Sequence, residues 1–383
     1  MKKIIFIIGT RADYGHLMPL IDSCINSKVF DVHLFVTGTH VLNDNRYQDN
    51  ERYGRTIQEI KNRYTNLIKI ESFYNGATGS ESMGDIVSNT IRGFSKYIRE
   101  EVDPDLVVIF GDRIEQLGAA ISSVLENILT IQIEAGDISG TIDESLRHSI
   151  SKLCHAHFVS NKIAKQRLIS MGEKEQNIFV IGCPSVDFLL SLDLSKIDEV
   201  KDKYKIKFLN YSIFIFHPVT TEYHNMSNNV KNVIDAIIES NLNYIAVAPN
   251  CDLGSELIWK EYERLKKSPN IRLFSSLPFK NYLTLLKNSD FIIGNSSSGV
   301  IEAPYLLTPT IDIGTRQNNR YFNKEIIKCD YNKNDILKKI KEALNCKISI
   351  SNEFGNGDSG KSFLNVLNSS YFWNINKQKS FIN

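Results

Sequence analysis

Charged and hydroxyl side chains follow several apolar runs of the sequence, and their types suggest acid–base chemistry. Three such groups lie in the first half, in GTRADYGH, GDRIE and IEAGDISGTIDESLRH. They supply Arg11, Asp13, His16, Asp112, Arg113, Glu134, Asp143, Glu144 and Arg147. Carboxylates such as Asp112, Glu134 and Asp143 repel phosphate, but they accept hydrogen bonds from sugar hydroxyls and transfer protons. We therefore predict that the first half binds a sugar and carries the acid–base groups.

The corresponding groups of the second half favour binding of a diphosphate. FHPVTTE, PNCD, GNSSSGVIEAP and GTRQNNR supply His217, Asn250, Ser296, Ser297, Ser298, Gly299, Glu302 and Arg316. A serine-rich loop that enters a helix offers backbone N–H groups, hydroxyls and the positive end of the helix dipole, which suit phosphate. Glu302 could accept hydrogen bonds from ribose hydroxyls, while Arg11 and His217 could neutralise a diphosphate from two sides of a cleft. The second half is thus predicted to bind a nucleoside diphosphate.

Each of these residues also has a structural interpretation. Serines after a strand are commonly helix N-caps, and Asp112 could cap the helix that follows it. Asp143 and Glu144 could be first-turn acids that complement a helix dipole, and His217 could be a satisfied histidine at a strand end. Glu134, in contrast, ends an apolar run where an unpaired carboxylate is costly, which favours a functional role.

Composition and motifs exclude several other functions. The net charge of +1 argues against nucleic-acid and anionic-membrane binding, and no apolar run reaches about 18 residues. The absence of GxxxxGK[ST] and GxGxxG argues against a P-loop and against NAD. The six cysteines form no CxxC pair, and His155 and His157 lack a third ligand at useful spacing. We predict no metal, no cofactor and a cytoplasmic location, since the apolar start MKKIIFIIGT has no signal-peptide cleavage site.

Short apolar runs, each followed by a polar loop and a helix-like segment, are the expected strands that position these side chains. The runs are 3–9, 31–38, 106–112, 129–136, 156–160, 178–184, 211–218, 243–250, 271–276, 291–297 and 310–314. Continuous hydrophobicity indicates parallel strands covered by helices on both faces. Eleven strands are more than a single sheet usually contains. A length of 383 residues suits two domains of roughly 150–200 residues. We predict an α/β protein with two Rossmann-like, doubly wound domains and a ligand at the carboxyl ends of the strands.

The domain boundary is predicted within IGCPSVDFLLSLDLSKIDEVKDKY, where Gly182 and Pro184 end a strand and a charged segment follows. This assigns residues 1–185 to the first domain and 186–365 to the second. The aromatic segment 366–383 follows the last strand unit, and we expect it to pack back onto the first domain.

The motifs resemble those of the UDP-N-acetylglucosamine 2-epimerases, specifically the hydrolysing branch of sialic-acid biosynthesis. GTRADYG, GDRIE, IEAGDISGTIDESLRHSISKL, FHPVTTE, IGNSSSGVIEAP and IDIGTRQNNR follow in the expected order from residue 9 to residue 320. The non-hydrolysing branch typically has a lysine at the position of His16, and an acidic pair in place of parts of NSSSGVIEA. ESMGDIVSNT also resembles the hydrolysing branch and is expected to form a mobile loop over the sugar.

The resemblance implies a glycosyltransferase-B type fold with the active site between the domains, a homodimer or homotetramer, and no metal or nicotinamide cofactor. It implies that Asp112, Glu134 and Asp143 are the acid–base carboxylates. It further implies that His217 and Arg11 contact the diphosphate or leaving group, and that Ser297, Ser298 and Glu302 hold phosphate and ribose. We count His217 among the catalytic residues, because it could also remove a proton.

The expected reaction converts UDP-N-acetylglucosamine and water into UDP and N-acetylmannosamine. UDP leaves first, and Arg11 and His16 are expected to face the departing diphosphate. The C2 proton then becomes acidic, and a carboxylate or His217 removes it to give 2-acetamidoglucal. Water then adds with inverted configuration at C2. Three alternatives stay open: the same reaction on UDP-2,4-diacetamido-2,4,6-trideoxyglucose in legionaminic-acid synthesis, a glycosyltransferase of this fold, and a catalytically silent nucleotide-sugar sensor.

Overall fold

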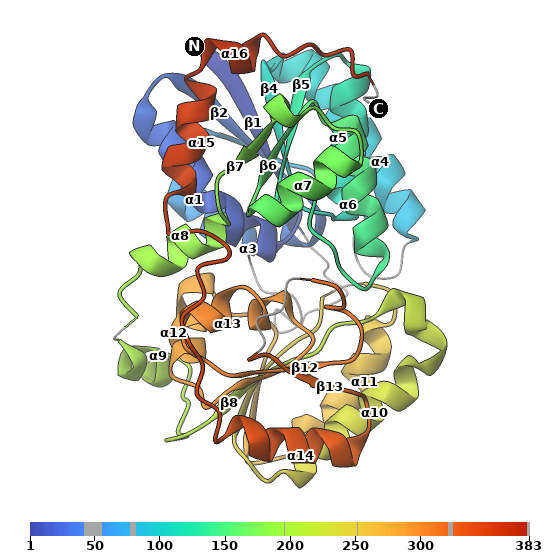
Figure 1. Cartoon of the computed structure of the whole chain (residues 1–383), viewed down its shortest axis with the longest axis vertical. Helices are drawn as coiled ribbons and strands as arrows, with labels where there is room; N and C mark the ends of the chain where they lie inside the picture. Colours follow the sequence, from blue (N-terminus) through green and yellow to red (C-terminus); the bar gives the residue numbers. More distant parts are fainter. Residues whose placement is uncertain (42–55, 77–81, 195, 251, 321–324, 381–383) are drawn as a thin grey trace.

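Two parallel sheets, each with helices on both faces, make up the computed structural model of the chain (Figure 1). The structure describes residues 1–41, 56–76, 82–194, 196–250, 252–320 and 325–380. For residues 11, 12, 39, 40 and 56 it describes the backbone alone.

The first sheet has the strand order β3-β2-β1-β4-β5-β6-β7. Its strands are β1 (Lys2–Ile8), β2 (Phe30–Val36), β3 (Lys69–Ser72), β4 (Leu106–Phe110), β5 (Leu129–Ile133), β6 (Ala156–Val159) and β7 (Ile178–Val180). Ile4 of β1 pairs in parallel register with Val32 of β2 and Leu106 of β4. From Ile4 to Ile8 the side chains of β1 are buried on both faces, which explains why this part of its sequence is apolar without alternation.

Helices cover both faces of this sheet. They are α1 (Arg11–Ser27), α3 (Thr56–Tyr64), α4 (Met83–Tyr97), α5 (Ile114–Leu125), α6 (Ile142–Leu153) and α7 (Lys162–Ser170). Phe6 of β1 packs with Leu17 of α1 on one face, whereas Ile5 packs with Phe94 of α4 and Ala119 of α5 on the other. The shorter helices are η1 (Gly38–Val41), the π-helix η2 (Ile98–Val102) and η3 (Glu175–Asn177).

The second sheet has the strand order β10-β9-β8-β11-β12-β13. Its strands are β8 (Ser212–Ile215), β9 (Tyr244–Val247), β10 (Ile271–Phe274), β11 (Ile292–Gly294), β12 (Thr310–Ile313) and β13 (Ile327–Cys329). Its helices are α9 (Ile197–Lys203), η4 (Thr220–Glu222), α10 (Tyr223–Glu239), α11 (Ser255–Leu265), α12 (Phe279–Lys287), η5 (Ser297–Gly299), α13 (Glu302–Tyr305) and α14 (Lys333–Ala343). Each half of the chain thus forms its own parallel sheet, which confirms the predicted α/β class with two doubly wound domains.

Every predicted strand is present, but two further strands were not predicted from the sequence. Both β3 and β13 are edge strands of three or four residues, KIES and IKC. An edge strand has one neighbour and needs no long apolar run, so its sequence carries little signal. The predicted loop in ESMGDIVSNT is wrong for its described part, because Met83 begins α4 and the Ser82 side chain caps that helix.

The chain crosses between the domains twice. The first crossing includes α8 (Pro184–Ser191), which contacts α1 of the first domain and α13 of the second. After the second crossing, α15 (Ser359–Leu367) and α16 (Ser370–Trp373) lie on the first domain, and α15 is drawn in red beside α1 (Figure 1). Phe363 and Phe372 are fully buried in its core, so the chain returns before residue 366. The boundary at residue 185 stays a prediction.

The two histidines considered above as a metal pair have separate partners. His155 Nδ1 accepts a hydrogen bond from Thr130 N at 3.0 Å, whereas His157 Nε2 contacts Glu173 Oε2 at 2.9 Å. The five cysteines within the described residues are free thiols, and Cys251 lies outside those residues. In the described part of the chain, no helix combines the length and the hydropathy required to cross a bilayer.

Candidate active site

A cleft of about 370 Å³ lies between the two domains, where the carboxyl ends of both sheets meet. The predicted residues that line it are Asp13, His16, Asp112, Arg113, Glu134, Asp143, Arg147, His217, Asn250, Ser296, Ser297, Ser298, Glu302 and Arg316. Residues from distant motifs therefore meet in one cavity, as parallel sheets with ligands at their strand ends require.

Three residues predicted for the site are not among the described residues that line the cleft. The side chain of Arg11 lies outside the described part of the structure. Glu144 Oε2 accepts a hydrogen bond from Ser139 N at 2.9 Å, so it holds the loop before α6. A Cβ on Gly299 would meet Thr310 Cγ2 at 2.6 Å, so glycine lets the serine turn lie against β12.

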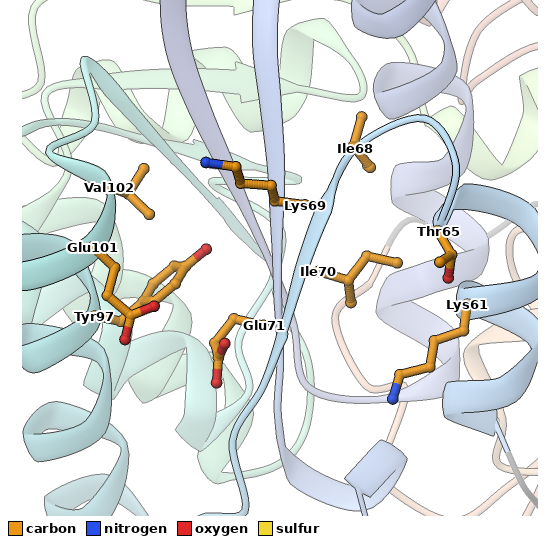
Figure 2. A pocket seen from close by; sticks show the side chains of 9 residues that line it. All are labelled: Lys61, Thr65, Ile68, Lys69, Ile70, Glu71, Tyr97, Glu101 and Val102. Atoms are coloured by element: carbon orange, nitrogen blue, oxygen red, sulfur yellow. The ribbon is translucent and has the colours of Figure 1, made fainter.

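A second hollow, of about 600 Å³, lies at the outer edge of the first sheet (Figure 2). Figure 2 shows Tyr97 and Glu101 on one side of β3 and Lys61 and Thr65 on the other. All of its lining residues come from one domain, and none belongs to the motifs described above. We therefore place the candidate site in the cleft between the domains.

Glu134 occupies a strained position directly after β5. Its backbone φ is +55°, in the left-handed region that a residue with a Cβ seldom adopts. Such a conformation costs about 1–3 kcal/mol and is concentrated at functional sites. The residue is 9% exposed, so the turn holds a mostly buried carboxylate at the end of the sheet.

The start of α1 positions His16 opposite this carboxylate. Thr10 and Asp13 form a capping box, in which Thr10 Oγ1 accepts from Asp13 N at 3.3 Å. Asp13 Oδ2 also accepts hydrogen bonds from Gly9 N at 3.0 Å and from Gln116 Nε2 at 3.0 Å. The Asp13 carboxylate thus anchors the helix on which His16 lies, in addition to lining the cleft.

His16 lies between two carboxylates. Its Nδ1 is 2.8 Å from Glu134 Oε1, and its Nε2 is 3.8 Å from Glu302 Oε1. Burial lowers the pKa of His16, but Glu134 and Glu302 outweigh this effect and raise it above its ordinary value. Burial likewise raises the pKa of Glu134, but the pairing with His16 outweighs it and leaves the pKa lowered. Both ring nitrogens therefore face carboxylates, whereas the sequence predicted that His16 faces a diphosphate.

The other two predicted carboxylates are each paired with an arginine. Asp112 Oδ2 accepts a hydrogen bond from Arg147 Nη2, and Asp143 Oδ2 lies 3.6 Å from Arg316 Nη2. Arg113, rather than Asp112, occupies the N-cap position of α5, so Asp112 does not cap that helix. Asp143 lies in the first turn of α6 and also lines the cleft, so its two interpretations are compatible.

His217 is held as a neutral hydrogen-bond donor. Its Nδ1 accepts from Asn250 N at 3.1 Å, so the proton of the neutral ring is on Nε2. Burial, together with Arg316 and Arg113, lowers the pKa of His217 to about 3. A ring with its proton on Nε2 can donate to an anion, but that nitrogen cannot remove a proton from carbon.

The serine loop differs from the predicted phosphate cradle. It forms the short 3₁₀ helix η5, and α13 that follows has only four residues, so the helix dipole contributes little. Ser296 Oγ accepts from Ser298 N at 3.3 Å, and Tyr282 OH donates to Ser298 Oγ at 2.7 Å. The N–H groups of Ser298 and Gly299 are thus bonded within the turn, and the serine hydroxyls are the donors that it offers to an anion.

Several residues of the site were missing from the predicted set. Asp252 pairs with Arg113 at 2.7 Å, and Arg320 pairs with Asp137 at 2.7 Å. Asp252 and Arg320 lie in strand-end motifs quoted above. Cys183 and Ser185 also contact site carboxylates, but their segment was interpreted only as a domain boundary. The sequence feature that could have identified them is the one used for the other site residues, a position soon after the end of a strand, because Cys183 and Ser185 follow strand β7.

Two Rossmann-like domains with a polar cleft between them define a protein of the glycosyltransferase-B type. Residues 22–368 match the family described as UDP-N-acetylglucosamine 2-epimerase, and the chain belongs to this family.

Individual relatives are similar over nearly the whole chain. A Neisseria meningitidis protein named UDP-N-acetylglucosamine 2-epimerase is 41% identical, over 100% of this chain and 99% of its own. A Legionella pneumophila protein named UDP-N,N'-diacetylbacillosamine 2-epimerase (hydrolyzing) is 35% identical, over 96% of each. The fold is similar to that of the UDP-GlcNAc 2-epimerase from Methanocaldococcus jannaschii, solved with UDP-GlcNAc and UDP. That structure has a TM-score of 0.79 and 22% identity and covers 95% of this chain and 99% of its own.

Proposed function

We propose that this protein is a hydrolysing UDP-N-acetylglucosamine 2-epimerase, which converts UDP-N-acetylglucosamine and water into N-acetylmannosamine and UDP. The product would supply sialic-acid biosynthesis, as in the branch that its motifs resemble. The observation that carries the proposal is the meeting of Glu134, Asp112 and Asp143 with the donors His217 and Arg316 in one cleft. Family membership and the similarity to the Neisseria relative support UDP-N-acetylglucosamine as the donor.

In the proposed first step, the bond between C1 and the diphosphate oxygen breaks and its electron pair leaves with UDP. The Nε2–H of His217, Arg316 and the serine turn would stabilise the negative charge that develops on the diphosphate. Because positive charge develops at C1, the C2 proton becomes acidic.

We assign the removal of the C2 proton to Glu134. Pairing with His16 lowers its pKa, so its carboxylate is ionised at neutral pH and available as a base. Proton loss gives 2-acetamidoglucal. Water then adds its oxygen to C1, and a proton is delivered to the opposite face of C2, with Asp112 and Asp143 as the acid–base groups. This assignment replaces His217 as the base, because its Nε2 carries a proton.

Hydrolysis, rather than release of a UDP-sugar epimer, is supported by His16 and by a relative. His16 stands where the non-hydrolysing branch typically has a lysine, and the Legionella relative carries a hydrolysing name. That relative also favours a second candidate substrate, UDP-2,4-diacetamido-2,4,6-trideoxyglucose, with the same chemistry.

The deciding experiment supplies each donor separately in heavy water and follows the products by proton and phosphorus NMR. We expect free UDP and N-acetylmannosamine with deuterium at C2 from UDP-N-acetylglucosamine. Accumulation of an epimeric UDP-sugar would contradict hydrolysis, and retention of the original hydrogen at C2 would exclude elimination. Faster turnover of the diacetamido donor would favour the second substrate. Binding without turnover of either donor would favour a sensor or a glycosyltransferase.

Two predictions on assembly and location accompany this function. We propose a homodimer or homotetramer, which light scattering of the purified protein tests. The cytoplasmic location is tested by cell fractionation.

A further inference from the structure

Hydrogen bonds to two carboxylates, Glu134 of the first domain and Glu302 of the second, link the domains beneath the cleft. Cys183 Sγ donates to Glu134 Oε1 at 2.9 Å and lies 3.3 Å from Ser185 Oγ. Ser185 Oγ donates to Glu302 Oε1 at 2.8 Å, and His16 lies between Glu134 and Glu302. Cys183 is 1% exposed and Ser185 is fully buried, so water does not compete for these contacts.

The two interdomain crossings hold Cys183 in place. Cys183 occupies the N-cap position of α8, and its backbone N donates to Phe354 O at 2.6 Å on the returning segment. The segments touch at two glycines, where a Cβ on Gly355 would meet Gly182 Cα at 2.9 Å. The thiol therefore has a fixed position relative to both domains.

The arrangement is a hydrogen-bond network centred on the Glu134 carboxylate. One ring nitrogen of His16, one carboxylate oxygen of Glu134 and Sγ of Cys183 all lie within 4.8 Å of one another, a spacing that a metal site also shows. Here, however, the imidazole and the thiol both reach the same oxygen, Glu134 Oε1. Burial and Glu134 raise the pKa of Cys183, which keeps the thiol protonated and able to donate.

We propose that Cys183 is a positioning residue that orients Glu134 for proton transfer, while its neighbour Ser185 orients Glu302 for the nucleotide. This role rests on the proposed function, which assigns C2 to Glu134 and the ribose to Glu302. Two donors on Oε1 fix the rotation of the carboxylate and leave Oε2 for the substrate. Because both carboxylates are held from one turn of α8, the base is aligned only when the domains are apposed.

Three variants separate positioning from a general structural role. Cys183→Ala should lower kcat by roughly 100-fold while the Kd for UDP stays unchanged, because a small displacement of a catalytic group is costly. Loss of a donor also raises the pKa of Glu134, so the acidic limb of the kcat profile should move to higher pH. Cys183→Ser keeps a donor and should restore most of the activity. Cys24→Ala, which removes an equally buried thiol from the core of the first domain, should change neither property.

Ser185→Ala provides a complementary test. It should weaken UDP binding in calorimetry and leave the pH profile of kcat unchanged. Equal kcat values and profiles for Cys183→Ala and wild type would overturn the proposal, as would unchanged UDP binding in Ser185→Ala.

The infrared S–H stretch of Cys183 tests the geometry without turnover. The band is identified by subtracting the spectrum of Cys183→Ala from that of the wild type. In Glu134→Gln it should move to higher frequency, because an amide is a weaker acceptor than a carboxylate. An unmoved band would overturn the proposed hydrogen bond from Cys183 to Glu134 even if the enzyme is an epimerase. If the band moves but the wild-type protein turns over neither UDP-sugar donor, the hydrogen bond from Cys183 to Glu134 is supported and the proposed function is rejected.

Discussion

Arg113 of the first domain and Asp252 of the second form an ion pair across the cleft, with Nη2 and Oδ1 2.7 Å apart. Both side chains are largely buried, and a second cross-domain pair joins Arg320 to Asp137 at 2.7 Å. The pairs connect loops at the carboxyl ends of the two sheets. They therefore hold the domains in the arrangement that brings the candidate catalytic groups together.

Asp252→Asn should destabilise this arrangement. It removes the nearer carboxylate of the buried Arg113 guanidinium and leaves Glu115, at 4.0 Å, as the other member of its ion pairs. Removal of one partner of a buried pair typically costs about 3–5 kcal/mol. We expect a lower free energy of unfolding, a higher KM for the UDP-sugar and a larger radius of gyration by small-angle scattering. The control is Glu239→Gln, which breaks the exposed pair with Lys333 and should change stability by less than about 1 kcal/mol. Equal effects of the two variants would contradict the interdomain role of Arg113 and Asp252.

Glu134→Gln should separate chemistry from binding. The amide retains the shape of the side chain but cannot accept a proton, so kcat should fall by roughly 10²–10⁴-fold. UDP should bind with near-normal affinity in calorimetry, because the diphosphate donors are on other residues. Near-normal turnover would remove Glu134 from the chemistry.

His217 variants test whether this residue donates a hydrogen bond or removes a proton. Glutamine can place an N–H near the position of Nε2, whereas alanine cannot. His217→Ala should therefore lose roughly 10²–10³-fold in kcat and His217→Gln distinctly less. Because the pKa of His217 is lowered to about 3, its ¹⁵N resonances should show a neutral ring throughout pH 5–8. Equal loss in both variants would favour a base.

Lys379→Met should loosen the C-terminal segment in a pH-dependent manner. Lys379 Nζ lies 2.6 Å from Glu173 Oε2, beside His157. Burial raises the pKa of Glu173, but His157 and Lys379 outweigh it and lower the pKa to about 2. The stabilisation is thus complete above the ordinary value of 4.5 and is lost as the pH falls toward 2. The variant should unfold at a higher pH during acid titration, monitored by Trp fluorescence. The control is Lys377→Met, at an exposed position. If both variants unfold with the same acid midpoint, the role of Lys379 is refuted.

The amino-acid order alone was sufficient for the fold class, the long central strands and the family. These features are local, because a strand buried on both faces must be apolar at successive positions, and a motif after such a strand lies at the sheet end. The short edge strands β3 and β13 escaped prediction because they lack that requirement.

The pairing of the site residues depended on the tertiary structure. His16 and Glu134 are 118 residues apart, and Cys183 is 49 residues from Glu134, so no spacing along the chain indicates their contacts. The tautomer of His217 likewise depends on a backbone N–H from another loop. Hydrogen bonds and pKa values arise from atoms within a few ångströms, and only the packing of the two domains decides which atoms those are.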